Sequence, residues 1–325
     1  MKLSHFPKYY WFYLIIVLST WFWYMGNNNL YHILEEHIYV MITMVFGSFI
    51  AGSSPEGSAS IAYPIFTLYL DVAPETARNF AFAIQSVGMT AASIYIWNKK
   101  LPFDRNYVKY VTLGGVFGLI LGTFFLAPYI QAKIAKLSFV SIWLSFGMIL
   151  YYLHLVGSKN TMSKIASLQV ADTLILLMLG LIGGFISSIF GTGINIFSFC
   201  FVVIYYGMDE KIAAKSSIII MTIETILGFA LHALILKDMN EISYQMWLSC
   251  IPIVIFFAPL GTYVLSKISN KTFANFLYFI FLVQYVGAIY VIKPNLYLMA
   301  ISVAIIILSI FVFYQIYKYR KVRFH

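Results

Sequence analysis

The sequence has little charge and almost no cysteine. Only 10% of its 325 residues are Asp, Glu, Lys or Arg, against roughly 25% in an average soluble domain. This shortage of charge excludes a soluble enzyme. The only cysteines, Cys200 and Cys250, both lie in apolar segments and have no metal-ligand spacing. We therefore expect neither a disulfide framework nor a metal site.

Long apolar runs make up most of the chain, of which 61% is hydrophobic. A membrane-spanning helix needs about 20 apolar residues, because each residue adds 1.5 Å. The runs are apolar on every face, whereas the strands of a membrane β-barrel alternate apolar and polar residues. We predict an all-α polytopic membrane protein with about eight full transmembrane helices. Their ranges are 9–25, 77–97, 108–127, 137–156, 213–236, 245–265, 273–292 and 296–317.

Two further apolar stretches, 38–70 and 172–206, are each interrupted near the middle. The first is broken between Gly52 and Ser58, and the second between Gly191 and Gly193. We predict that each forms a re-entrant hairpin, with two short helices around a tip. The unpaired backbone groups at such a tip must be buried in protein or line a wet cavity. In transporters, interruptions of this kind commonly mark the substrate site.

The two broken stretches match each other at an offset of 136 residues, which places 47–50 on 183–186 and Gly57 on Gly193. A second match places 121–124 on 260–263. These matches predict an internal duplication. Residues 1–35 would form an N-terminal transmembrane helix, 36–156 repeat 1 with a hairpin and three helices, 157–171 a cytoplasmic linker, 172–293 repeat 2, and 294–325 a C-terminal transmembrane helix with a basic tail.

The basic residues predict the orientation of the chain. If both broken stretches are re-entrant and the N-terminus is cytoplasmic, 16 of the 21 Lys and Arg residues fall inside. The five outside are Arg78, Lys133, Lys136, Lys237 and Lys293. This bias follows the positive-inside rule. It predicts cytoplasmic termini and a second repeat that is inverted relative to the first. The net charge of +9 is therefore interpreted as orientation in the bilayer, and no nucleic-acid partner is expected.

A Gly-rich broken segment near the start of each half, followed by a short loop and an Ala-rich helix, resembles the sulfite exporter TauE/SafE family. The matching stretches run from Gly47 to Ala77, with Pro64, and from Gly183 to Ala213. The resemblance extends over about 40 to 292. It implies an inverted-repeat secondary transporter of small sulfur-containing or carboxylated anions in the cytoplasmic membrane. The family's tips resemble G-x-G-G-G, whereas the first tip here is 54–58, Ser-Pro-Glu-Gly-Ser.

The tips are the predicted substrate site. Helices that leave them near Gly57 and Gly193 would direct their N-terminal N–H groups and positive dipole ends toward the midplane, as an anion cradle. The small polar residues of the tips can donate hydrogen bonds to an anion, or they can cap these helices. Polar residues on the helices after the hairpins, which also include Ser86, form a second group. The predicted substrate-binding residues are Ser54, Glu56, Gly57, Ser58, Gly191, Thr192, Gly193, Asn195, Asn79, Gln85, Lys215 and Thr222.

Two acidic residues, Glu56 and Glu224, are predicted to couple transport to H⁺ or Na⁺. A membrane-buried acid is a functional candidate by default, and at mid-helix a charge costs at least about 2.5 kcal/mol on insertion scales. Glu224 should therefore face the bundle interior, with a partner from another helix. For Glu56 the alternative is a carboxylate that caps the helix beginning at Gly57. No cofactor and no metal ion are expected.

The leading hypothesis is secondary transport of a small anion by alternating access. One alternative is a proton- or sodium-coupled carrier of another solute that uses Glu56 and Glu224. A channel or a lipid scramblase is a further alternative, and so is a structural protein. An intramembrane enzyme has little support, because no H-E-x-x-H motif is present and the six histidines are scattered. The expected partners are a small anionic substrate, the lipid bilayer and a second copy of the chain in a homo-oligomer.

Overall fold

Eight helices in the described part of the chain are long and apolar enough to cross a membrane. The computed structural model describes residues 8–58, 65–66, 70, 72–129, 132–155, 162–165 and 168–323. The eight are α5 (Pro74–Asn98), α6 (Arg105–Phe125), α7 (Ala132–Leu155), α8 (Val170–Phe190), α10 (Glu210–Ala230) with its π-helical continuation η4 (Leu231–Leu236), α11 (Glu241–Lys267), α12 (Asn270–Ile292) and α13 (Leu296–Arg323). The prediction of an all-α polytopic membrane protein is confirmed.

The set of eight differs from the predicted one at one position. The first predicted crossing forms α1 (Lys8–Asn27), but this Tyr- and Trp-rich helix is not among the eight. In its place stands α8, which was predicted as a short arm of the second hairpin and is 21 residues long. A capping box of Gln169 and Asp172 starts α8 early, and the left-handed Gly191 ends it. The first arm of the second broken stretch is thus about 30 Å long at 1.5 Å per residue.

Shorter elements lie around the long helices. The 16-residue helix α3 leads to the first break, and α9 and π-helical η3 follow the second. Residues 59–64 and 67–69, where a helix leaving Gly57 was predicted, lie outside the described residues. The shorter elements are α2 (Ile33–Glu36), α3 (Ile38–Ser53), η2 (Ala127–Tyr129), α9 (Ile194–Phe201) and η3 (Val202–Tyr206).

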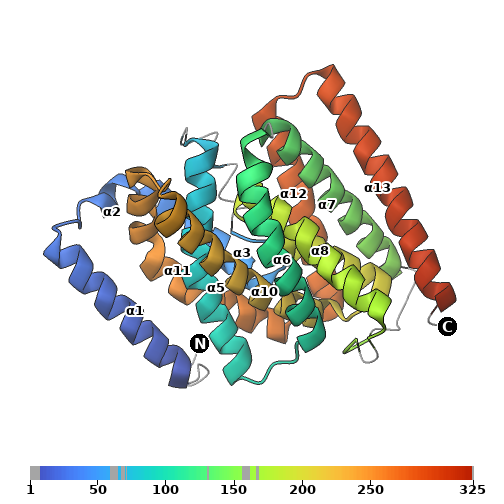
Figure 1. Ribbon diagram of the computed structural model, residues 1–325, viewed down its shortest axis with the longest axis horizontal. Coiled ribbons are helices and arrows are strands. Elements are labelled where there is room, and N and C mark those ends of the chain that lie inside the picture. The colour runs from blue at the N-terminus through green and yellow to red at the C-terminus, as the bar shows by residue number, and fades with distance from the viewer. Residues whose placement is uncertain are drawn as a thin grey trace.

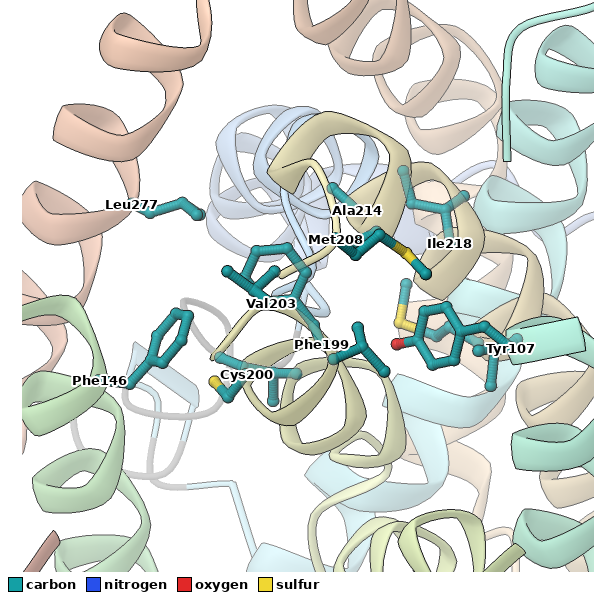
Figure 2. Packing of buried hydrophobic residues seen from close by; sticks show 14 of the residues in the cluster. Tyr107, Phe146, Phe199, Cys200, Val203, Met208, Ala214, Ile218 and Leu277 are labelled. Atoms are coloured by element: carbon teal, nitrogen blue, oxygen red, sulfur yellow. The ribbon is translucent and has the colours of Figure 1, made fainter. Parts of the chain in front are cut away.

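The short helix α9 is enclosed by protein. Phe199 and Cys200 are buried, and with Val203 of η3 they lie among Phe146 of α7 and Leu277 of α12 (Figure 2). Helices α1 and α13 lie at opposite edges of the molecule (Figure 1). The second break is therefore in the interior, where its backbone is shielded from lipid.

Glycines let α6 and α8 pack backbone to backbone. A Cβ atom on Gly114 would lie 2.0 Å from the carbonyl oxygen of Leu177, and one on Gly118 would lie 2.0 Å from that of Leu181. Gly180 of α8 makes the reciprocal approach, because its Cβ would lie 2.1 Å from a carbonyl oxygen of α6. The contacts advance in the same direction on both helices, so α6 and α8 are parallel. Small residues are what such close helix approach requires in a membrane.

The helix α3 packs against α11 in the same manner. A Cβ on Gly52 would lie 1.9 Å from the Ala258 carbonyl oxygen, and one on Gly261 would lie 2.1 Å from that of Phe49. The contact between His37 and Gln245 near the start of both helices shows that α3 and α11 are also parallel. Each arm that leads to a break therefore packs on a helix of the other predicted repeat. The division into repeats itself stays a prediction.

Two prolines inside α11 explain how α1 is attached to the bundle. Pro252 and Pro259 have no N–H group, so the carbonyl groups four residues earlier lose their helical donors. Trp21 of α1 donates its Nε1–H to the Leu248 carbonyl at 2.7 Å, and the Tyr10 hydroxyl donates to the Ile255 carbonyl at 2.9 Å. The aromatic donors of α1 thus satisfy the two acceptors that the prolines leave open.

We expect Tyr10→Phe to lower the stability of the purified protein by about 1 kcal/mol, because a buried carbonyl loses its donor. The loss should largely disappear in a Pro259→Ala background, where the new N–H at position 259 serves the Ile255 carbonyl. Thermal unfolding in detergent of the two single variants and the double variant measures this coupling. An equal loss in both backgrounds would show that the hydroxyl stabilises α1 in another way.

Candidate functional site

The two breaks in the chain meet in the interior. A Cβ atom on Gly57 would lie 2.3 Å from Oγ1 of Thr192 and 2.4 Å from Oε1 of Gln85. Asn195 donates its Nδ2–H to the Pro55 carbonyl, and Gln85 donates to the Gly191 carbonyl at 3.3 Å. Of the predicted site residues, Gly57, Gln85, Thr192 and Asn195 thus come together here. The positions of Gly191 and Gly193 are given below. We refer to the segments 54–58 and 191–195 as the two tips.

The first tip begins where α3 ends. Pro55 cannot continue the helix and keeps the preceding residue out of the helical conformation, and Ser54 is accordingly extended. The Ser54 hydroxyl donates to the Ile50 carbonyl at 2.8 Å and accepts from the N–H of Glu56 at 3.2 Å. Ser54 therefore satisfies the backbone at the helix end, and Ser58 at the end of the tip is also buried.

The second tip depends on two glycines with positive φ. Gly191 has φ +74° and Gly193 has φ +158°, and a Cβ on Gly191 would also lie 2.6 Å from the Arg78 carbonyl oxygen. The N–H of Ile194 donates to the Ser187 hydroxyl at 3.0 Å. Backbone N–H groups that the sequence offers to an anion are thus already bonded within the protein.

Asn195 completes the bonding of the second tip. Its Oδ1 accepts from the N–H of Gly193 and from the Thr192 hydroxyl, each at 3.2 Å. Its Nδ2 reaches across to the first tip, as described above. The amide of Asn195 therefore both holds the second tip together and joins the two tips.

Glu56 is buried at the junction with only 1% of its surface exposed. Its Oε2 accepts a hydrogen bond from Nε2 of Gln284 in α12. Lys136 of α7, 8% exposed, is close enough to interact electrostatically with Glu56. The Lys136 ammonium also lies 5.8 Å from the ring centre of Phe190, the last residue of α8. The carboxylate thus has an amide donor and a buried ammonium group within electrostatic range.

Gln284 and Lys136 were not predicted as site residues. Gln284 was an isolated polar residue on a late helix, and Lys136 was assigned to the outer loop by the charge bias. One signal could have identified Lys136. It is the fifth residue of an apolar helix that begins at Ala132, and a cation within such a helix needs a partner.

Glu224 lies inside the bundle, in the middle of α10, with 3% of its surface exposed. Its Oε2 accepts from the Ser187 hydroxyl of α8 at 3.1 Å. Its Oε1 is buried and has no hydrogen-bond partner among the described residues. Ser187 also accepts from the N–H of Ile194, as noted above, so Glu224 is connected to the start of α9 through one hydroxyl.

Two of the second group of predicted residues lie near helix starts. Asn79 donates to the Asp238 carbonyl at 3.1 Å, beside an ion pair of 3.4 Å between Arg78 and Asp238. Lys215 lies near Lys211 at the start of α10. Neither residue contacts the tips through a hydrogen bond that the structure describes.

Two further polar residues of this group stabilise helix contacts. Thr222 joins α10 to α5, because its hydroxyl donates to the Met89 carbonyl at 2.9 Å and lies 2.7 Å from that of Ser93. The Ser86 hydroxyl donates to the Ala83 carbonyl of its own helix. Of the second group, Gln85 alone is seen at the tips. No cluster of three or more His, Cys, Asp or Glu residues suited to a metal occurs in the described ranges.

The broken helices that meet inside a bundle of apolar helices define a multi-pass membrane protein of the transporter type. Residues 40–288 match the sulfite exporter TauE/SafE family. Because the match extends over more than half of the chain, the protein belongs to this family, and its function class is membrane transport. Neither a curated protein nor a solved structure gave a match.

We expect Gly57→Ala to force the tips apart and to destabilise the protein by roughly 1–3 kcal/mol, the usual cost of overpacking. The matched control is Gly287→Ala, since a Cβ on Gly287 meets nothing within 4 Å. Thermal unfolding of both variants in the same detergent makes the comparison. Equal stability of the two variants would contradict the close contact of the tips.

Proposed function

We propose that the protein is a secondary transporter that moves a small organic or sulfur-containing anion, of the sulfite, sulfonate or carboxylate class, across the cytoplasmic membrane. Transport proceeds by alternating access. The substrate binds at the junction of the two tips. The N- and C-termini are cytoplasmic, as the distribution of Lys and Arg favours.

One observation carries this proposal: the two interruptions of the apolar chain come together at a buried junction of Gly57, Gln85 and Thr192. Irregular backbone at membrane depth is tolerated where it is buried or lines a cavity, and transporters use it for their substrate sites. The amide of Gln284 and the buried Lys136, which both act on the carboxylate of Glu56, give the junction the chemistry of an oxyanion site.

The packing of the arms supports an inverted-repeat mechanism. The two proposed repeats are 36–156 and 172–293. In the parallel pairs α3 with α11 and α8 with α6, the arm of one proposed repeat packs on a helix of the other. The central helices α5 and α10, which follow the two tips, pack against each other. Movement of one repeat relative to the other would expose the junction to one side of the membrane at a time.

A second candidate is a carrier coupled to H⁺ or Na⁺. It is favoured by Glu224, a buried carboxyl group with one hydroxyl donor and one oxygen without a described hydrogen-bond partner. An ionised group in such surroundings is costly unless a cation or proton neutralises it. The carboxyl group of Glu224 then binds the coupling ion while the tips bind the anion.

The test of transport uses the purified protein in proteoliposomes. We expect uptake of sulfite, methanesulfonate or acetate down an imposed gradient, and about a tenfold loss of rate for Asn195→Ala, equivalent to about 1.4 kcal/mol. Asn98→Ala is the matched control, because Asn98 donates only to the Ile94 carbonyl of its own helix. Absence of uptake for all three anions overturns the proposed substrate class.

The test of coupling compares wild type with Glu224→Gln. If Glu224 carries the ion, the variant still equilibrates the anion but no longer accumulates it in response to a pH or sodium gradient. The control is Glu210→Gln, since Glu210 is also buried but contacts His154 at 2.9 Å, at the start of α10. Gradient-driven accumulation by Glu224→Gln at the wild-type level excludes Glu224 as the coupling residue.

A further inference from the structure

Most donors at the junction of the tips are bonded to backbone carbonyls. Nδ2 of Asn195 bonds to the Pro55 carbonyl, and Nε2 of Gln85 bonds to the carbonyls of Ala81 and Gly191. These amides hold the tips together, so they are not available to a substrate in this conformation. Two further donors, Gln284 and Lys136, act on Glu56.

The surroundings of Glu56 are those of a bound oxyanion. One carboxylate oxygen takes an amide N–H from α12, and a buried ammonium from α7 supplies the opposite charge. Hydrogen bonds to an ionised carboxylate are stronger than hydrogen bonds between neutral groups. A buried ammonium without an anion would be strongly destabilising. The pair Lys136 and Gln284 is thus an oxyanion site that the protein's own side chain fills.

Glu56 and its two partners lie on backbone of different kinds. The residues from Ser54 to Ser58 form no regular helix, whereas Lys136 and Gln284 lie within α7 and α12, which pack against each other. The donors are therefore held on packed helices and the internal anion on irregular backbone. A substrate that displaces Glu56 would meet donors already in position.

We propose that Lys136 and Gln284 bind the transported anion, and that Glu56 occupies their site as a tethered competitor when no substrate is bound. The ligand class is a small oxyanion with a carboxylate, sulfite or sulfonate group. The proposal rests on the proposed function and extends it, because it assigns the ligands of the anion. When a substrate anion replaces the carboxylate of Glu56, the positive charge of Lys136 stays compensated.

The test measures anion binding by thermal shift on the full-length protein in detergent, with sulfite and acetate as probes and chloride to hold the ionic strength constant. Removal of a tethered competitor raises the apparent affinity by the inverse of the fraction of sites that the competitor had left open. We expect Glu56→Gln to bind either probe at least about tenfold more tightly than wild type. The added change Lys136→Gln should abolish the gain, and the control Glu210→Gln should bind as wild type does.

A second variant covers the case in which Glu56→Gln does not fold. Glu56→Asp keeps the charge but shortens the side chain by one methylene, which withdraws the carboxylate from Gln284. We expect anion affinity between those of wild type and Glu56→Gln. The proposal is overturned if neither substitution tightens binding, or if Lys136→Gln leaves the affinity of Glu56→Gln unchanged.

Transport assays separate this proposal from the proposed function. If Glu56→Gln binds the probes more tightly in a Lys136-dependent manner while wild-type vesicles transport none of them, the anion site stands and the transport proposal fails. If wild type transports an anion and Glu56→Gln neither binds it more tightly nor lowers its KM, the transport proposal stands and the tethered competitor is rejected.

Discussion

The contact between the two tips is the constraint on which the rest of the structure depends. Each tip interrupts a helix at a depth where hydrocarbon offers no hydrogen-bond partners, so its backbone groups must be satisfied by protein. The two tips and the neighbouring helix α5 supply such partners. Asn195 reaches the carbonyl of Pro55, and Gln85 reaches that of Gly191. Gly57 permits the approach, because any side chain there would collide with Thr192. Separated in space, the two interruptions would each leave buried polar groups unpaired.

The glycine contacts are the means by which the tips are brought together. The arms α3 and α8 each lie directly on the backbone of a partner helix. Gly52 of α3 lies against α11, and Gly114 and Gly118 of α6 lie against α8. Between membrane helices there is no hydrophobic driving force, so close packing and hydrogen bonds must supply the association energy. Glycine serves both the turn at the tip and the packing of the arm. This double use explains why the same residue type recurs along both broken stretches.

Much of the fold could be predicted from the sequence because it follows from local composition. The lengths of apolar runs set the crossings, and the breaks near Gly57 and Gly193 marked the tips. Helix α8 was predicted as a short arm, although its start at Val170 differs little from the predicted start of the stretch at Asp172. The partners of Glu56 could not be predicted, because Gln284 lies 228 residues away and no local pattern connects the two. The attachment of α1 to the proline-freed carbonyls of α11 was missed for the same reason.

The two buried acids have different surroundings, and this difference separates their chemistry. Glu56 lies beside an ammonium group and an amide donor, so its negative charge is compensated within the site. Glu224 has the hydroxyl of Ser187 as its described hydrogen-bond donor and takes part in no ion pair among the described residues. A charge that is compensated in place can compete with an anionic ligand, whereas one that is not compensated must be neutralised by a proton or a cation before it is buried. The two positions, which we propose for an anion and for its coupling ion, are connected through α8, whose Ser187 contacts Glu224 and whose Phe190 lies 5.8 Å from the Lys136 ammonium.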